Sequence, residues 1–486
     1  MSLVSLSKQA RRLESHPDRL LPADKATRAV AQQLYQRVSS LPIVSPHGHV
    51  DLHMLVKDEP FSDPATLFVT SDHYMTRLLH AAGIGHDQLF VDDDKRSEAV
   101  TRKQWHVLCD HWSVIRGSVV QLWLENQLAD IFGVELVPAP ETADTIYDQL
   151  TERLAADEYR PRALYRRFGI EVLATTDDPA SDLSAHTALA ADPSWTGRVI
   201  PAFRPDRYLE PDHRGWPDAV DALGAAANVD IGGYDGFVTA LESRRQTFRH
   251  LGATTTDHAH LDARAEPLDR SEALRIYRAA QNGDISRDEA AAFRRHMIFE
   301  MARMSCEDGL VMTLHPGVLR DHHGPTARRF GPDRGADIPV QAEFTHALRP
   351  MLERFGTYPG FHLVVFTADE TTWSRELAPL AGFYPCLYLG APWWFLDAPE
   401  AIRRFRAAVT DIVGYTRTSG FIDDARAFCS IPARHDMSRR LEVAALAQRV
   451  TEHRLREEEA EEILLDLVTS QPMKVFKLDR GTGDAE

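Results

Sequence analysis

Two histidines, His47 and His49, flank a single glycine in the stretch IVSPHGHVD, directly after an apolar run. In an extended segment, residues i and i+2 point to the same side, so both imidazoles could bind one metal ion. Two polar residues at the end of a strand would give the same pattern. The choice between these interpretations depends on which other side chains the fold brings to this point.

Further metal-binding side chains come at the ends of other apolar segments. His315 follows VMTL, and the acidic pair Asp423 and Asp424 lies in GFIDDAR. Neutral imidazoles with one carboxylate suit zinc or a similar divalent ion that keeps one position open for substrate. Asp423 remains an alternative to Asp424 as the carboxylate ligand. The predicted metal site therefore consists of His47, His49, His315 and Asp424.

Residues close to these ligands could move protons or stabilise charge. Arg426 lies two residues after Asp424, so it could hold that aspartate ionised and stabilise negative charge on a substrate oxygen. The stretch DHYMTR predicts a helix start with Asp72 as its N-cap. It supplies His73 and Tyr74, whose side chains are typical proton-transfer groups. A surface aspartate–arginine pair and an ordinary surface histidine are the structural alternatives.

Eight short apolar segments that end in polar or turn residues alternate with helical stretches. Eight strands alternating with helices predict an α/β fold, a (β/α)8 barrel whose active site lies at the carboxyl ends of its strands. The fourth segment is irregular, because its start resembles the end of a helix. The segments are 41–49, 170–179, 197–206, 250–258, 309–317, 361–370, 385–394 and 420–426.

The interval between the first and second segments is too long for a loop in a compact domain. Apolar residues recur there at helical spacing, which indicates a helical insertion beside the barrel mouth. The predicted organisation has four parts. They are an N-terminal helical segment with the first strand (1–51), the helical insertion (52–168), the remainder of the barrel (169–436) and a C-terminal helix with a polar tail (437–486).

The composition excludes several classes of function. A formal net charge of −17 argues against nucleic acid or an anionic membrane as a partner, and an acidic substrate would need a local cluster of arginines. Between residues 104 and 473 there is no lysine, which excludes a Schiff base or a carbamylated lysine bridging two metals in that region. Four cysteines without CxxC spacing, and an N-terminus broken by charges, predict a cytoplasmic protein.

The motifs, in their order and spacing, resemble the uronate isomerase (glucuronate isomerase) family of the amidohydrolase superfamily. They are PHGH, DHYMTR, TTDDP, FRPD, TDH, LHPGVLR, WWF and DDARAFCSIPARHD, and the resemblance runs from about residue 15 to about residue 478. It implies a distorted (β/α)8 barrel with a helical insertion after the first strand. It also implies interconversion of D-glucuronate with D-fructuronate and of D-galacturonate with D-tagaturonate.

The resemblance implies one divalent metal, with zinc as the expected ion, but not whether turnover requires it. FTAD at 366–369 has no histidine where binuclear hydrolases of the superfamily have a ligand, which favours a single metal. His47, His49 and Asp424 would be metal-site residues, with His315 close by. His73 and Tyr74 would handle hydroxyl protons, Arg426 would assist at the metal centre, and Arg320 and Trp393 would line the pocket. The substrate carboxylate would need an arginine, with Arg320 as the first candidate and Arg434 as the second.

The expected reaction is an aldose–ketose isomerisation of a small-molecule hexuronate through a cis-enediol. A metal-dependent hydrolase of a lactone or ester, and a sugar-acid binding protein without catalysis, are the alternatives. The chain has TDHA where the family tends to have SDHG, and Asp321, His322 and His323 where it tends to have asparagines. These departures leave the preferred sugar open, and the composition leaves open whether the chain forms a homo-oligomer.

Overall fold

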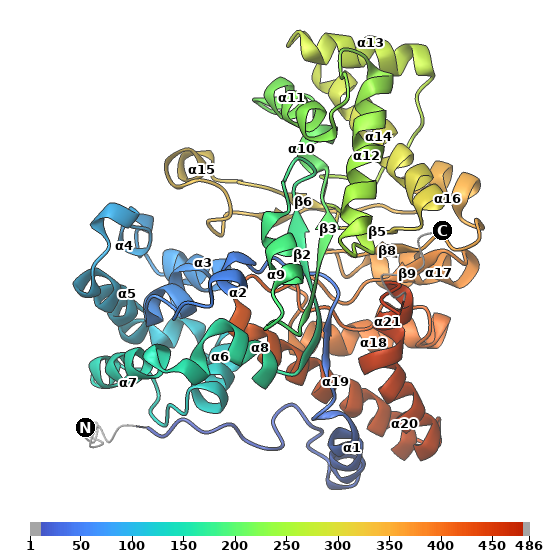
Figure 1. Cartoon of the computed structure of the whole chain (residues 1–486). Coiled ribbons are helices and arrows are strands. Elements are labelled where there is room, and N and C mark those ends of the chain that lie inside the picture. The colour runs from blue at the N-terminus through green and yellow to red at the C-terminus, as the bar shows by residue number, and fades with distance from the viewer. Residues whose placement is uncertain (1–10, 480–486) are drawn as a thin grey trace, which may run out of the picture.

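The protein is represented by a computed structural model that describes residues 11–479 (Figure 1). In this part of the chain, seven parallel strands form one curled sheet in the order β1-β2-β3-β4-β5-β8-β9. This arrangement agrees with a distorted barrel, and the first seven strand predictions are confirmed. The strands are Ile43–Ser45 (β1), Ile170–Asp177 (β2), Arg198–Phe203 (β3), Thr255–His258 (β4), Val311–Leu314 (β5), Leu363–Val365 (β8) and Leu387–Leu389 (β9).

Helices lie between the strands, as a sheet built from parallel crossovers requires. The helix α12 ends at His250, so the fourth predicted segment does begin as the end of a helix. Helices α11 to α14 stand together at the top of Figure 1. The bounds are Ser184–Ala191 (α9), Asp206–Leu209 (α10), Trp216–Ala227 (α11), Tyr234–His250 (α12), Arg270–Gln281 (α13), Arg287–Asp308 (α14), Gly324–Phe330 (α15), Arg349–Phe355 (α16), Ala378–Phe383 (α17) and Pro399–Val413 (α18).

The eighth predicted strand is wrong. Residues 420–426, which lie within the described range, form no strand, and the neighbouring Thr418 makes only an isolated parallel bridge to Leu389 of β9. Toward β1, the backbone amide of His49 donates a hydrogen bond to the carbonyl of Ala425 at 2.9 Å. Gly420 and Asp424 have φ values of 75° and 46°, outside the extended region. This seam, residues 417–425, therefore joins β9 to the β1 end through isolated hydrogen bonds.

The described chain between β1 and β2 is largely helical, and these helices lie to the left of the sheet in Figure 1. Asp72 caps α3, because its side chain accepts a hydrogen bond from the amide of Tyr74, which confirms the predicted helix start. The division of the chain into four parts remains a prediction. The helices are His53–Lys57 (α2), His73–Ala81 (α3), His86–Leu89 (α4), Glu98–Asp110 (α5), Val119–Asn126 (α6), Ala143–Ala155 (α7) and Pro161–Arg167 (α8).

The C-terminal region consists of several helices rather than one. The chain leaves α19 (Ile431–Thr451) and turns at His453, whose φ is 58°, before α20 (Glu457–Leu465) and α21 (Gln471–Val475). Helix α19 packs against α1 (Lys25–Val38), which ties the two ends of the fold together. The predicted polar tail at 480–486 and the first ten residues lie outside the described residues. Within the described range, every helix is too short or too polar to cross a bilayer.

Candidate functional site

A cavity of about 300 Å³ lies at the carboxyl ends of the strands. It is where a barrel of this kind places its active site. All ten residues singled out from the sequence line it, although they come from the segments that follow β1, β5 and β9, from α3, from residues 424–426 and from α19. They are His47, His49, His73, Tyr74, His315, Arg320, Trp393, Asp424, Arg426 and Arg434.

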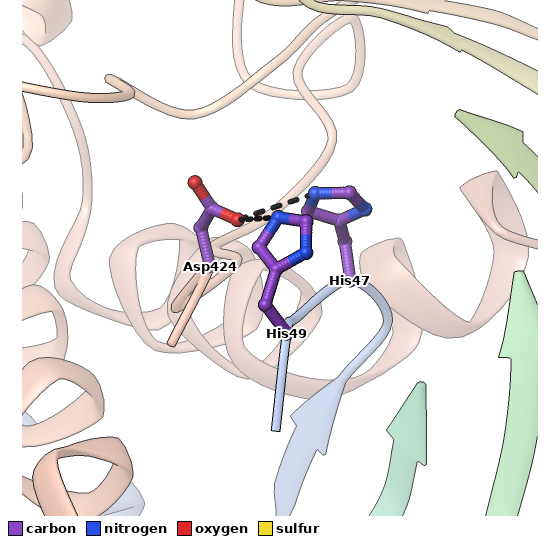
Figure 2. A group of neighbouring side chains, drawn as sticks. All are labelled: His47, His49 and Asp424. Atoms are coloured by element: carbon purple, nitrogen blue, oxygen red, sulfur yellow. Dashed lines mark ion pairs between the residues drawn. The ribbon is translucent and has the colours of Figure 1, made fainter. Parts of the chain in front are cut away.

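The two histidines after β1 and the carboxylate of the seam converge on one point (Figure 2). The Nε2 atoms of His47 and His49 lie 3.2 Å and 3.1 Å from Oδ1 of Asp424. That oxygen is buried, and no described residue gives it a hydrogen bond of acceptable geometry. Two imidazole nitrogens and a carboxylate oxygen that face one another are the ligands that a divalent cation needs. The predicted HxH–aspartate cluster is therefore present.

The choice between the two adjacent aspartates is resolved by where their side chains point. The Asp423 carboxylate faces away from the histidine pair, and its Oδ2 lies 3.0 Å from Nε2 of His435 in α19. The backbone of Asp424 is left-handed, and the side chain of this residue points into the cavity. Trp393 holds it there by donating from Nε1 to Oδ2 at 2.7 Å. Asp424 is thus the carboxylate of the cluster.

His315 lies beside this cluster. Its ring stacks on that of His47 with centroids 4.7 Å apart, and its Nδ1 lies 2.8 Å from Oδ1 of Asp257. Its Nε2 is buried and has no hydrogen-bond partner within the described residues. His47, Asp257 and His315 form a second group of donors close enough to hold a cation. His315 therefore has a free nitrogen and an anchored one, as a metal-binding histidine needs.

Burial and neighbouring charges set the protonation states at the cluster. Burial alone would raise the pKa of Asp424, but the close imidazoles of His47 and His49 hold it well below 3.8. Burial lowers the pKa of both His49 and His315, which keeps their rings neutral. Burial also acts to lower the pKa of His47, but Asp257 and Asp424 outweigh it and raise the pKa. A metal would have to displace the proton that these carboxylates favour on His47.

A phenol, a carboxylate and a guanidinium form a buried network beside the cluster. The hydroxyl of Tyr74 donates to both carboxylate oxygens of Asp397, at 3.0 Å and 3.1 Å. Arg434 donates to the same carboxylate at 2.9 Å, and its guanidinium lies 3.7 Å from the ring centroid of Trp123. Burial and the charge of Asp397 raise the pKa of Tyr74 well above 10, so the phenol keeps its proton. Burial lowers the pKa of the neighbouring His73.

Four arginines line the cavity in a chain whose net charge is strongly negative. Arg320 directly follows the short strand β6 (Val318–Leu319), which pairs with β7 (Ile338–Pro339), and it lies 3.2 Å from Asp337, which directly precedes β7. Arg426 pairs with Asp333 at 3.0 Å. The side chains of Arg320 and Arg426 are 37% and 40% exposed, whereas that of Arg434 is 5% exposed. The first two therefore offer accessible guanidinium groups.

Several cavity residues were not identified as site residues from the sequence. Arg204 and Asp257, which contact each other at 3.2 Å, come at the ends of β3 and β4. Their positions at strand ends were a usable signal. Asp333 and Asp397 lie in long connections and reach the site only through tertiary contacts with arginines. No local pattern marks them.

Known proteins match this chain over nearly its whole length. A family model described as glucuronate isomerase matches residues 24–476. Uronate isomerases of Corynebacterium efficiens and Cutibacterium acnes are 47% and 48% identical, over 96% and 95% of this chain and 99% and 98% of theirs. The crystal structure of glucuronate isomerase from Caulobacter crescentus matches with a TM-score of 0.94 at 42% identity, covering 97% of this chain and 98% of that one. That of uronate isomerase from Thermotoga maritima matches with a TM-score of 0.89 at 27% identity, covering 95% and 99%.

Proposed function

This chain belongs to the glucuronate isomerase family, and we propose that its cavity interconverts D-glucuronate with D-fructuronate and D-galacturonate with D-tagaturonate. The observation that carries the proposal is the convergence of a histidine–aspartate cluster, a buried phenol and several arginines in one cavity. Hydrolysis of a lactone or ester is not favoured, because the matching relatives are named uronate isomerases. The free cysteines support a cytoplasmic location, where thiols stay reduced.

One divalent metal, with zinc as the expected ion, would be held by His47, His49 and Asp424, with His315 as a candidate further ligand. The donor set suits such an ion, and the unsatisfied Oδ1 of Asp424 supports its presence. When bound, a divalent metal polarises a substrate oxygen and favours its anionic form. Trp393 would keep the carboxylate of Asp424 oriented through its indole hydrogen bond.

The remaining residues have roles in proton transfer and binding. Asp424 and His73 would act as base and acid in opening the sugar ring. A base then removes the proton from C2, and Arg426 stabilises the negative charge of the cis-enediol that results. Tyr74 returns a proton to C1, since burial and Asp397 keep its phenol protonated. Arg434 would hold Asp397 and Tyr74 in place and is the second candidate for the substrate carboxylate.

Proton NMR in D2O tests this function directly. With D-glucuronate or D-galacturonate, we expect the ketohexuronate product to appear with deuterium at C1, because the proton removed from C2 exchanges with solvent. The same incubation with a chelator should slow the reaction, and added zinc should restore it. Unchanged sugar in every tube, together with rapid turnover of lactones, would exclude the isomerase function.

Arg320 is the first candidate for binding the substrate carboxylate, because its guanidinium is accessible and lies 4.7 Å from the ring centroid of Trp394. We expect Arg320→Gln to raise KM for hexuronates about tenfold, the loss of one charge-assisted hydrogen bond, with a much smaller change in kcat. Steady-state kinetics measure both constants. Arg329→Gln on α15, outside the cavity lining, is the control and should leave KM unchanged. An unchanged KM in Arg320→Gln would transfer the role to Arg434.

A further inference from the structure

A second histidine pair with the same spacing as His47 and His49 follows β4. His258 is the last residue of β4, and His260 comes two residues later. Asp206, the first residue of α10, faces both, and one donor atom from each of the three residues lies within 4.8 Å of the other two. We propose that Asp206, His258 and His260 form a second divalent-metal site, for zinc or a similar transition metal.

Each imidazole in this cluster has one ring nitrogen anchored by a neighbour and the other free. Nδ1 of His260 lies 2.8 Å from Oε1 of Glu210, and Nε2 of His258 lies 3.1 Å from the hydroxyl of Thr256. Nδ1 of His258 and Nε2 of His260 have no hydrogen-bond partner among residues 11–479. Metal-binding histidines have this arrangement, in which a carboxylate or hydroxyl fixes the ring and leaves the opposite nitrogen for the ion.

The burial of the cluster makes two free nitrogens unfavourable unless a cation satisfies them. His258 is 1% exposed and His260 is 4% exposed. Burial lowers the pKa of His258 to about 3, so its ring is neutral and offers a lone pair. Burial also acts to raise the pKa of Asp206, but Arg204 and His260 outweigh it, so the carboxylate is ionised. Two of the three donors, His258 and Asp206, therefore already have the protonation states that a metal requires.

An ion pair is the competing explanation of the same contacts. A protonated His260 would bridge Glu210 and Asp206, whose Oδ1 lies 3.3 Å from its Nε2. This explanation satisfies His260 but leaves the buried Nδ1 of His258 without a partner. A cation satisfies both rings at once, so the geometry favours the metal.

The second site lies behind the wall of the catalytic cavity, since none of its three ligands lines that cavity. A metal ion there would stabilise the positions of the residues that form this wall. Asp206 accepts a hydrogen bond from Nε of Arg204 at 2.9 Å, and Arg204 in turn contacts Asp257 at 3.2 Å. An ion at Asp206 would thus tie the end of β3 to the end of β4 and set the position of Arg204. The site is structural and takes no part in proton transfer.

Anomalous diffraction from crystals of the full chain equilibrated with zinc tests the proposal without any variant. Data collected on the two sides of the zinc edge should give a peak among Asp206, His258 and His260. A second peak is expected at His47, His49 and Asp424. A peak at the catalytic cluster alone would overturn the second site. A peak at the second site alone would support the second site and count against the proposed catalytic metal. The experiment therefore distinguishes failure of one proposal from failure of the other.

Metal analysis in solution gives an independent readout. After equilibration with zinc and desalting, the wild-type chain should retain two equivalents, and His260→Gln and His49→Gln should each retain one. His250→Gln, at the exposed end of α12, is the matched control and should retain two. Zinc should raise the melting temperature of His49→Gln, because this variant keeps the second site. A wild-type chain that retains one equivalent, unchanged in His260→Gln, would contradict the proposal.

Discussion

Replacing Asp424 with asparagine is expected to lower kcat/KM for hexuronates by about 10³-fold or more, because the substitution removes both a metal ligand and a base. Asparagine has the shape of aspartate and can still accept the hydrogen bond from Trp393. It lacks the negative charge that faces His47 and His49. The variant should therefore fold and lose bound metal. Isomerisation by NMR and metal content by mass spectrometry measure these two effects.

The adjacent aspartate provides a matched control. Asp423 is buried against His435 in α19 and does not face the cluster, so Asp423→Asn should weaken folding by about 1–3 kcal/mol while retaining the metal. Thermal unfolding separates the two variants. Comparable activity in Asp424→Asn and the wild-type chain, or loss of metal only in Asp423→Asn, would show that the carboxylate ligand has been assigned to the wrong residue.

Tyr74→Phe is expected to reduce kcat by about 10²–10³-fold with little change in KM, because the ring remains and only the proton donor is removed. The ring would still pack edge-on against Trp123, at a centroid distance of 5.6 Å. Asp397 would keep its contact with Arg434 at 2.9 Å and so remain paired. Steady-state kinetics and the rate of deuterium incorporation at C1 should fall together.

A similar network far from the cavity provides the control for this variant. The hydroxyl of Tyr35 in α1 donates to Asp436, which also pairs with Arg440 at 2.8 Å. Tyr35→Phe removes the same atom from a tyrosine–aspartate–arginine network without touching the cavity. Its stability should fall about as much as that of Tyr74→Phe, while its kcat should not change. Equal losses of kcat in both variants would mean that Tyr74 acts only through the fold.

The sequence predicted the parallel strands well, because buried strands are short apolar runs that end in polar residues. It failed at residues 420–426, where the apolar start is brief and two positive φ values prevent an extended strand. The single C-terminal helix failed for the same kind of reason, since the chain turns at His453 with a φ of 58°. Hydrophobic periodicity indicates which residues are buried, but it does not predict backbone turns that tertiary contacts stabilise.

The candidate site was predictable to the extent that its residues stand at strand ends. The histidine pair after β1 and His315 after β5 follow that rule. The helix start DHYMTR supplied His73 and Tyr74 of α3, and the family resemblance added Arg434 of α19. Asp333 and Asp397 could not be found, because each lies in a connection and acquires its partner only when distant segments pack. The second histidine pair, His258 and His260, was visible in the sequence, but its partner Asp206 is adjacent only in the folded chain.

The seam has a consequence for how the family can diversify. Residues 417–425 join β9 to the β1 end by isolated backbone bonds, and Asp424 reaches across with contacts to His47, His49 and Trp393. Selection for turnover and selection for a closed barrel therefore act on the same residues here. A substitution at the seam would impair both catalysis and barrel closure. New sugar preferences would accumulate instead in the β6–β7 hairpin, which contributes to the cavity without closing the sheet.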